Sequence, residues 1–196
     1  MTDRFEVLVV CYANLCRSPL VERLTRKAFS DWAGFEVRSA GVAAVPGMPM
    51  HPYAEAVLRE CGAADAGFLT RALSAELLTR ADLVLTASRE QRAWCVSLAS
   101  AAVRYTFTMR QFGRLASTVE PGSLPDAPPV ARAHALVEEV ARARGEHQPV
   151  AAEDDDLADP VGRPVELFRA CARQIQSEFV DVVTTLLTPP TPTPAP

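Results

Sequence analysis

Hydrophobic positions repeat along the chain with two periods, and the changes between them mark the predicted elements. Residues 7–10 form an apolar, mostly β-branched run that is typical of a buried strand. Residues 18–31 place apolar side chains at helical spacing, with Pro19 tolerated in the first turn. Residues 35–38 predict a second strand. This strand, helix and strand order predicts a right-handed βαβ unit in a parallel sheet.

The rest of the chain continues this alternation. Two more buried strands are predicted over residues 81–86 and 103–108. Further helices are predicted over residues 53–61, 74–80, 89–99, 109–116, 130–144 and 165–187. The pattern predicts one α/β domain over residues 1–187, a three-layer sandwich with a four-stranded parallel sheet. Residues 119–152 are expected to be an elaborated loop-and-helix insertion, and the proline-rich residues 188–196 a disordered tail.

Composition narrows the class of protein. The chain has 196 residues, of which 48% are hydrophobic, enough for one sizeable core. Its net charge of −4 argues against nucleic-acid binding, which needs a basic face. No apolar run approaches the ~20 residues that span a membrane, and the first residues lack the pattern of a signal peptide. Five cysteines with no CxxC pair argue against a metal site and favour reduced thiols, so a cytoplasmic location is expected.

The candidate chemistry lies directly after the first strand, in the stretch CYANLCRSP of residues 11–19. A tight loop between a strand and a helix start points its backbone N–H groups inward and forms an anion site. The guanidinium of Arg17 adds a planar fork that grips two phosphate oxygens. The backbone that would surround the phosphate belongs to Tyr12, Ala13, Asn14, Leu15, Cys16 and Arg17.

Cys11 would lie at the bottom of this positively charged loop. The loop amides, the helix dipole and Arg17 favour its thiolate, which makes Cys11 a candidate nucleophile toward phosphorus. Ser18 is placed to donate a hydrogen bond to that thiolate. Asn14 tolerates a left-handed backbone, and its side chain can tie the loop together.

The stretch from Cys11 to Pro19 resembles the signature loop of the low-molecular-weight protein tyrosine phosphatases, and the resemblance spans about residues 5–187. It implies a cysteine-dependent phosphatase that needs no metal or organic cofactor. It implies that Ser39, in a Ser-Ala-Gly stretch, supports the loop. It also implies that Cys16 forms a reversible disulfide with Cys11 that protects the nucleophile from over-oxidation.

The same resemblance assigns the general acid. Members of the family carry an Asp-Pro before the last helix, and Asp159 and Pro160 stand at that place here. Asp159 would protonate the leaving phenolate oxygen and then help to activate water. Asp156 is the backup candidate, within an acidic run over residues 154–156 that is otherwise expected to be solvated. Met48, Met50 and His51 lie in a proline-rich loop that borders the pocket in the family.

The predicted function is therefore hydrolysis of phosphomonoesters, most of all protein phosphotyrosine, through a cysteinyl-phosphate. Three alternatives stay open. An arsenate-reductase-like thiol enzyme shares the scaffold, although the other cysteines form no pair on one segment. A non-catalytic phosphate-binding protein is favoured by Ala13, by Phe68 and by the absence of aromatic residues after Pro160. A phosphatase for a small phosphomonoester, with Tyr12 narrowing the pocket, is the third. The sequence predicts neither the physiological substrate nor the oligomeric state.

Overall fold

A four-stranded parallel sheet forms the centre of the molecule, which a computed structural model describes over residues 4–63 and 67–189. The strands lie in the order β2-β1-β3-β4. Their bounds are β1 Phe5–Cys11, β2 Phe35–Gly41, β3 Leu83–Thr86 and β4 Thr106–Thr108. The predicted fold class is thus confirmed. Most of the predicted disordered tail, residues 190–196, lies outside the described residues.

Helices follow most strands, as the hydrophobic periods predict. The α-helices are α1 Arg17–Ala28, α2 Pro52–Glu60, α3 Ala75–Arg80, α4 Arg89–Leu98, α5 Met109–Ala116, α6 Pro129–Glu146, α7 Ala152–Asp155, α8 Val165–Ile175 and α9 Asp181–Leu187. One predicted strand is partly wrong. Residues 103–105 belong to a 3-10 helix, Ser100–Tyr105, and only the last three residues of the predicted segment pair as β4. Periodicity alone does not separate a short apolar strand from a helical turn.

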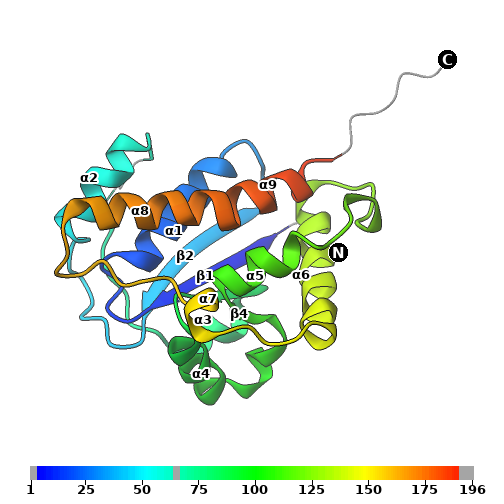
Figure 1. Ribbon diagram of the computed structural model, residues 1–196, viewed down its shortest axis with the longest axis horizontal. Helices are drawn as coiled ribbons and strands as arrows, with labels where there is room; N and C mark the ends of the chain where they lie inside the picture. The colour runs from blue at the N-terminus through cyan, green and yellow to red at the C-terminus, as the bar shows by residue number, and fades with distance from the viewer. Residues whose placement is uncertain (1–3, 64–66, 190–196) are drawn as a thin grey trace.

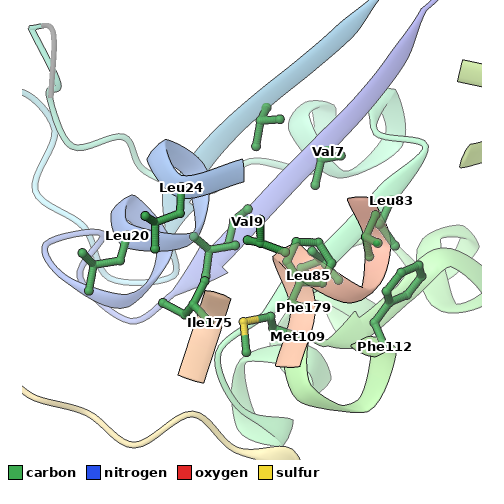
Figure 2. Close-up of a cluster of buried hydrophobic side chains, with 14 of the residues drawn as sticks. Val7, Val9, Leu20, Leu24, Leu83, Leu85, Met109, Phe112, Ile175 and Phe179 are labelled. Atoms are coloured by element: carbon green, nitrogen blue, oxygen red, sulfur yellow. The ribbon is translucent and has the colours of Figure 1, made fainter. Parts of the chain in front are cut away.

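The two faces of the sheet have separate cores, because successive side chains of a strand point to opposite faces. Val7 and Val9 of β1 belong to the larger cluster, and Leu8 and Val10 belong to the smaller one. The larger core is covered by α1, α5, α8 and α9, and the smaller one by α3 and α4, so the molecule has three layers (Figure 1). Figure 2 shows the larger core, where side chains of β1 and β3 meet those of α1, α5 and the closing helix.

The closing helix is continuous from α8 to α9 through a π-helical turn, Gln176–Val180. A Cβ atom added to Gly113 of α5 would lie 1.8 Å from the carbonyl oxygen of Glu178 in this turn. The absence of a side chain at Gly113 therefore lets the two helices touch through their backbones. Phe112 and Phe179 pack edge-to-face beside this contact, with ring centroids 6.1 Å apart.

Helix α6 lies inside the segment predicted to be an insertion, yet it packs on the main core. Leu136 and Val140 are fully buried in the larger cluster. Arg132 is also buried, and its guanidinium donates to the carbonyl oxygen of Leu186 at the end of α9. Within residues 4–63 and 67–189, no helix has the length and apolarity to cross a membrane.

Candidate active site

The loop of residues 11–17 connects the end of β1 to the start of α1, as predicted. Cys11 is the last residue of β1, and Arg17 is the first residue of α1. Between them, Asn14 has a left-handed backbone with a φ of 56°. Parallel α/β sheets bind ligands at the carboxyl ends of their strands, which is where this loop lies.

Asn14 fixes the shape of the 11–17 loop through its side chain, which is fully buried. Its Nδ2 donates to the hydroxyl oxygens of Ser18, at 2.9 Å, and Ser39, at 2.8 Å. Its Oδ1 accepts a hydrogen bond from the backbone N–H of Arg71 at 2.8 Å. These three bonds stabilise a backbone conformation that most residues avoid. The support predicted for Asn14 and Ser39 is thus consistent with their contacts.

The sulfur of Cys11 accepts two hydrogen bonds. The hydroxyl of Ser18 donates to it at 3.0 Å, and the backbone N–H of Asn14 donates at 3.3 Å. The sulfur is thus held in place by one side-chain donor and one backbone donor. Cys11 is buried, at the base of the loop.

Neighbouring segments hold the loop from outside. Gly41, the partner of Cys11 in the β1–β2 register, lies directly against it. A Cβ atom at Gly41 would come within 2.6 Å of the carbonyl oxygen of Tyr12 and 2.7 Å of the amide nitrogen of Asn14. The proline-rich loop after β2 also binds it, because the N–H of Ala43 donates to Tyr12 and the N–H of His51 donates to the carbonyl of Leu15.

Arg17 contacts the segment that carries the candidate acid. Its guanidinium forms an ion pair with the carboxylate of Asp159 and donates to the carbonyl oxygen of Leu157 at 3.2 Å. The Arg17 side chain is 8% exposed and that of Asp159 is 45% exposed. Asp159 also accepts from the N–H of Val161 at 3.1 Å. The structure therefore brings the predicted clamp and the predicted acid together at the mouth of the 11–17 loop.

The sequence analysis missed Glu22. Its carboxylate, buried within α1, accepts a hydrogen bond from the hydroxyl of Ser39 at 2.5 Å. Glu22 thus binds Ser39, whose hydroxyl oxygen in turn accepts a hydrogen bond from Asn14. Glu22 follows Ser18 by four positions, so both lie on one face of α1, and that spacing is the signal that could have revealed it.

The remaining cysteines differ in their surroundings. Burial raises the pKa of the Cys16 thiol well above its ordinary value, and the nearby Cys11 and Asp159 raise it further. Burial likewise raises the pKa of Cys171, in α8, to about 12 and that of Cys95, in α4, to about 12. Cys61 is exposed at the end of α2. Within the described residues, no group of three or more acidic, histidine or cysteine side chains could hold a metal ion.

The proline-rich loop places its candidate residues differently. Met50 is buried and Met48 is exposed. His51 begins α2, where its Nδ1 accepts from the N–H of Tyr53 at 3.1 Å, and its ring stacks on Phe168 at 4.8 Å. The structure thus explains His51 as a helix cap.

The prediction that residues 154–156 are all solvated is wrong. Asp155 is 1% exposed, and its carboxylate binds the guanidinium groups of Arg89 and Arg114. Asp156, the backup acid, accepts from the backbone N–H of Arg89 at 2.8 Å. Arginines distant in sequence decide this burial, because a buried carboxylate must be paired.

Known proteins resemble this chain in sequence and in fold. A probable low molecular weight protein-tyrosine-phosphatase from Ralstonia solanacearum is 37% identical over 86 residues, which is 44% of this chain and 57% of that protein. A protein-arginine-phosphatase from Geobacillus stearothermophilus is 27% identical over 173 residues, covering 88% of this chain and 90% of its own length. The solved structure of a low molecular weight protein tyrosine phosphatase from T. tengcongensis has a TM-score of 0.66 at 25% identity, over 91% of this chain and 96% of that one.

The sequence model for low molecular weight phosphotyrosine protein phosphatases matches residues 6–142, which include the 11–17 loop and, except for Phe5, all four strands. The chain therefore belongs to the low molecular weight phosphotyrosine protein phosphatase family.

Proposed function

We propose that the protein hydrolyses phosphotyrosine in proteins through a cysteinyl-phosphate intermediate. One observation carries the proposal. The sulfur of Cys11 accepts from Ser18 and from a loop amide, and Arg17, six residues later, pairs with Asp159. A stabilised thiolate, an arginine fork and a carboxyl group are the groups that a phosphoryl transfer without metal needs.

In the first step, the thiolate of Cys11 attacks phosphorus in line with the leaving oxygen. The S–P bond forms as the P–O bond to the tyrosine breaks. Arg17 and the loop amides stabilise the charge on the three equatorial oxygens. The protonated carboxyl of Asp159 transfers its proton to the leaving oxygen, so that tyrosine departs neutral.

In the second step, water attacks the phosphorus of the cysteinyl-phosphate. The carboxylate of Asp159, left deprotonated by the first step, accepts a proton from that water. The S–P bond breaks, inorganic phosphate leaves, and the Cys11 thiolate is restored. Asp159 thus regains in the second step the proton that it loses in the first.

The Arg17–Asp159 ion pair couples the binding of substrate to the release of the acid. A phosphate dianion that binds Arg17 competes with the carboxylate of Asp159 for the same guanidinium. The displaced carboxylate is then free to take up the proton that the first step requires. Binding of the substrate phosphate to Arg17 therefore also releases Asp159 to act as the acid.

Exposed apolar side chains near the loop support an aromatic substrate. Tyr12 is 57% exposed within the loop, and Val161, two residues after the acid, is 49% exposed. Met48, on the proline-rich loop that binds Tyr12 and Leu15 through backbone bonds, is 50% exposed. Such side chains suit contact with a phenyl ring.

Phosphoarginine is the second candidate substrate. The relative that this chain matches over 88% of its length is named a protein-arginine-phosphatase. The nucleophile, the clamp and the acid would serve there too, with a P–N bond in place of the P–O bond. Only the leaving group, and the side chains that hold it, would differ.

The test compares turnover of p-nitrophenyl phosphate, a phosphotyrosine peptide and the matched phosphoarginine peptide. Cys11→Ser is expected to lower every rate by at least about 10³-fold. Asp159→Asn is expected to lower the rate on the phosphotyrosine peptide by about 100-fold, because tyrosinate leaves poorly without a proton. Asp154→Asn, an exposed carboxyl in the same acidic run, is the matched control and should leave the rates unchanged.

A rate on phosphoarginine above that on phosphotyrosine would replace the first candidate by the second. A wild-type protein that binds phosphate without turnover would overturn both and favour a phosphate-binding protein. Arsenate reduction coupled to thiol oxidation would favour the reductase alternative.

A further inference from the structure

A second positively charged pocket lies at the same edge of the sheet as the 11–17 loop, beyond the carboxyl ends of β3 and β4. Its volume is about 260 Å³. We call it the arginine pocket, and its charged and titratable lining consists of Arg89, Arg92, Arg114, Arg144, His147 and Asp155. Four guanidinium groups thus face one carboxylate, an excess of positive charge in a chain whose net charge is −4.

The single carboxylate is fully used by two of the arginines. Asp155 accepts from Arg89 at 2.6 and 3.0 Å through one oxygen, and from Arg114 at 2.9 Å through the other. Arg92 and Arg144 have no carboxylate partner within the parts of the chain that the structure describes. Both donate instead to the same carbonyl oxygen, that of Thr106, at 2.9 and 3.0 Å. Two cations are therefore held close together, and neither has a carboxylate within ion-pair distance among the described residues.

Their surroundings make this arrangement costly in the absence of an anion. Burial lowers the pKa of Arg92, and the charge of Arg89 lowers it further against the opposing effect of Asp155. Burial also lowers the pKa of Arg144, with the charge of Arg92 adding to it. A guanidinium nevertheless stays charged at neutral pH. An anion in the pocket would relieve both the desolvation and the repulsion.

The pocket is also organised before any ligand arrives. The guanidinium of Arg144 lies over the ring of Phe107, 4.4 Å from its centroid, which fixes its plane. The Nε of Arg114 is buried and has no hydrogen-bond partner among the described residues, so a donor remains unused. Planar forks held in place with spare donors suit phosphate oxygens, which accept two parallel hydrogen bonds from one guanidinium.

We propose that the arginine pocket binds a small anion with two or more linked phosphate groups, at a site separate from the 11–17 loop. The four guanidinium groups of the pocket carry more positive charge than the single carboxylate of Asp155 balances. The same chemistry occurs in free polyphosphate and in nucleotide polyphosphates. This inference does not depend on the proposed hydrolysis.

The test is calorimetric titration with tripolyphosphate. Arg17→Ala removes the phosphate clamp of the 11–17 loop, and the affinity of the remaining site should stay within about threefold of the wild type. Replacing Arg92 and Arg144 together by Gln should weaken that site by at least tenfold, because two uncompensated charges are lost. Arg59→Gln, on exposed α2, is the matched control and should change nothing.

Two readouts keep the test decisive. Thermal unfolding reports whether the double variant folds, and the Nε–Hε NMR resonances of the wild-type arginines should shift on titration whether or not it does. Equal affinity for tripolyphosphate and ATP would identify the phosphate chain as the group recognised, and tighter ATP binding would identify a nucleotide. Binding lost in Arg17→Ala but kept in the double variant, or no second binding event, would overturn the proposal.

Discussion

The guanidinium of Arg17 is bound to the carboxylate of Asp159, so the clamp and the acid of the proposed mechanism occupy each other. Asp159→Asn should therefore bind inorganic phosphate more tightly than the wild type while it turns over substrate more slowly. A partly exposed ion pair of this kind contributes about 1 kcal/mol, which corresponds to roughly fivefold in affinity. The inhibition constant of phosphate, as a competitive inhibitor of turnover, measures this change in affinity.

Asp154→Asn is again the control, since it removes an equal charge without touching Arg17. Weaker or unchanged phosphate inhibition in Asp159→Asn would show that the ion pair does not compete with the ligand.

Gly41→Ala should damage the 11–17 loop more than the fold. Its new Cβ would press on the backbone of Tyr12 and Asn14, which then moves. Displaced loop amides lose their alignment with the phosphate, and we expect turnover to fall by about 100-fold. Steady-state kinetics on p-nitrophenyl phosphate measures this loss.

Gly122→Ala is the comparison, because a Cβ there meets nothing within 4 Å. Full activity in Gly41→Ala would mean that the loop tolerates a shift of its backbone.

Gly113→Ala should act on stability. Its Cβ cannot coexist with the carbonyl of Glu178 at 1.8 Å, so α5 must move away from the closing helix. Overpacking of this kind costs about 3 kcal/mol of the free energy of unfolding. Urea unfolding followed by circular dichroism measures it.

Gly145→Ala is the opposite case, in α6 with open space around its Cβ. It should raise the free energy of unfolding by about 0.5 kcal/mol, because alanine favours a helix. Equal stability of the two variants would contradict the contact between α5 and the π-helical turn.

The Cys11–Cys16 disulfide, which stays a prediction, should form faster as the pH rises. Burial raises the pKa of Cys16, so little of it is thiolate at neutral pH. The thiolate is the form that attacks oxidised Cys11, and its fraction grows about tenfold per pH unit below the pKa. Peptide mass mapping after mild peroxide, at pH 7 and pH 9, follows the linkage.

Cys16→Ala should abolish the linkage, and Cys95→Ala, a buried thiol in α4, should not. A rate independent of pH would show that deprotonation of Cys16 does not limit the reaction.

The sequence predicts the βαβ unit and the placement of Cys11 and Arg17 well, because both follow from local periodicity and one short loop. It also predicts that Asn14 and Ser39 each support the 11–17 loop, although only the resemblance to a family suggests Ser39. The roles of these residues in catalysis stay predictions.

Buried charges were harder to predict. The acidic neighbours of Asp155 predict a solvated side chain. Its partners Arg89 and Arg114, however, lie 66 and 41 residues away. Glu22 of α1 is hard to identify for the same reason, since its partner Ser39 lies in strand β2. Similarly, the close approach of the π-helical turn to α5 requires Gly113, which lies in a different helix. Partners distant along the chain decide all three contacts, and only Glu22 has a local signal, its spacing of four from Ser18.

The wide separation of Arg17 and Asp159 along the chain, 142 residues, has a consequence for folding. The 11–17 loop obtains its supporting contacts from residues up to Arg71, whereas the acid arrives only when almost the whole chain has folded. Contacts between distant residues close late, because the entropy of the intervening chain opposes them. A refolding protein should therefore regain phosphate binding before it regains turnover, and parallel stopped-flow measurements of the two would reveal a binding-competent intermediate without an acid.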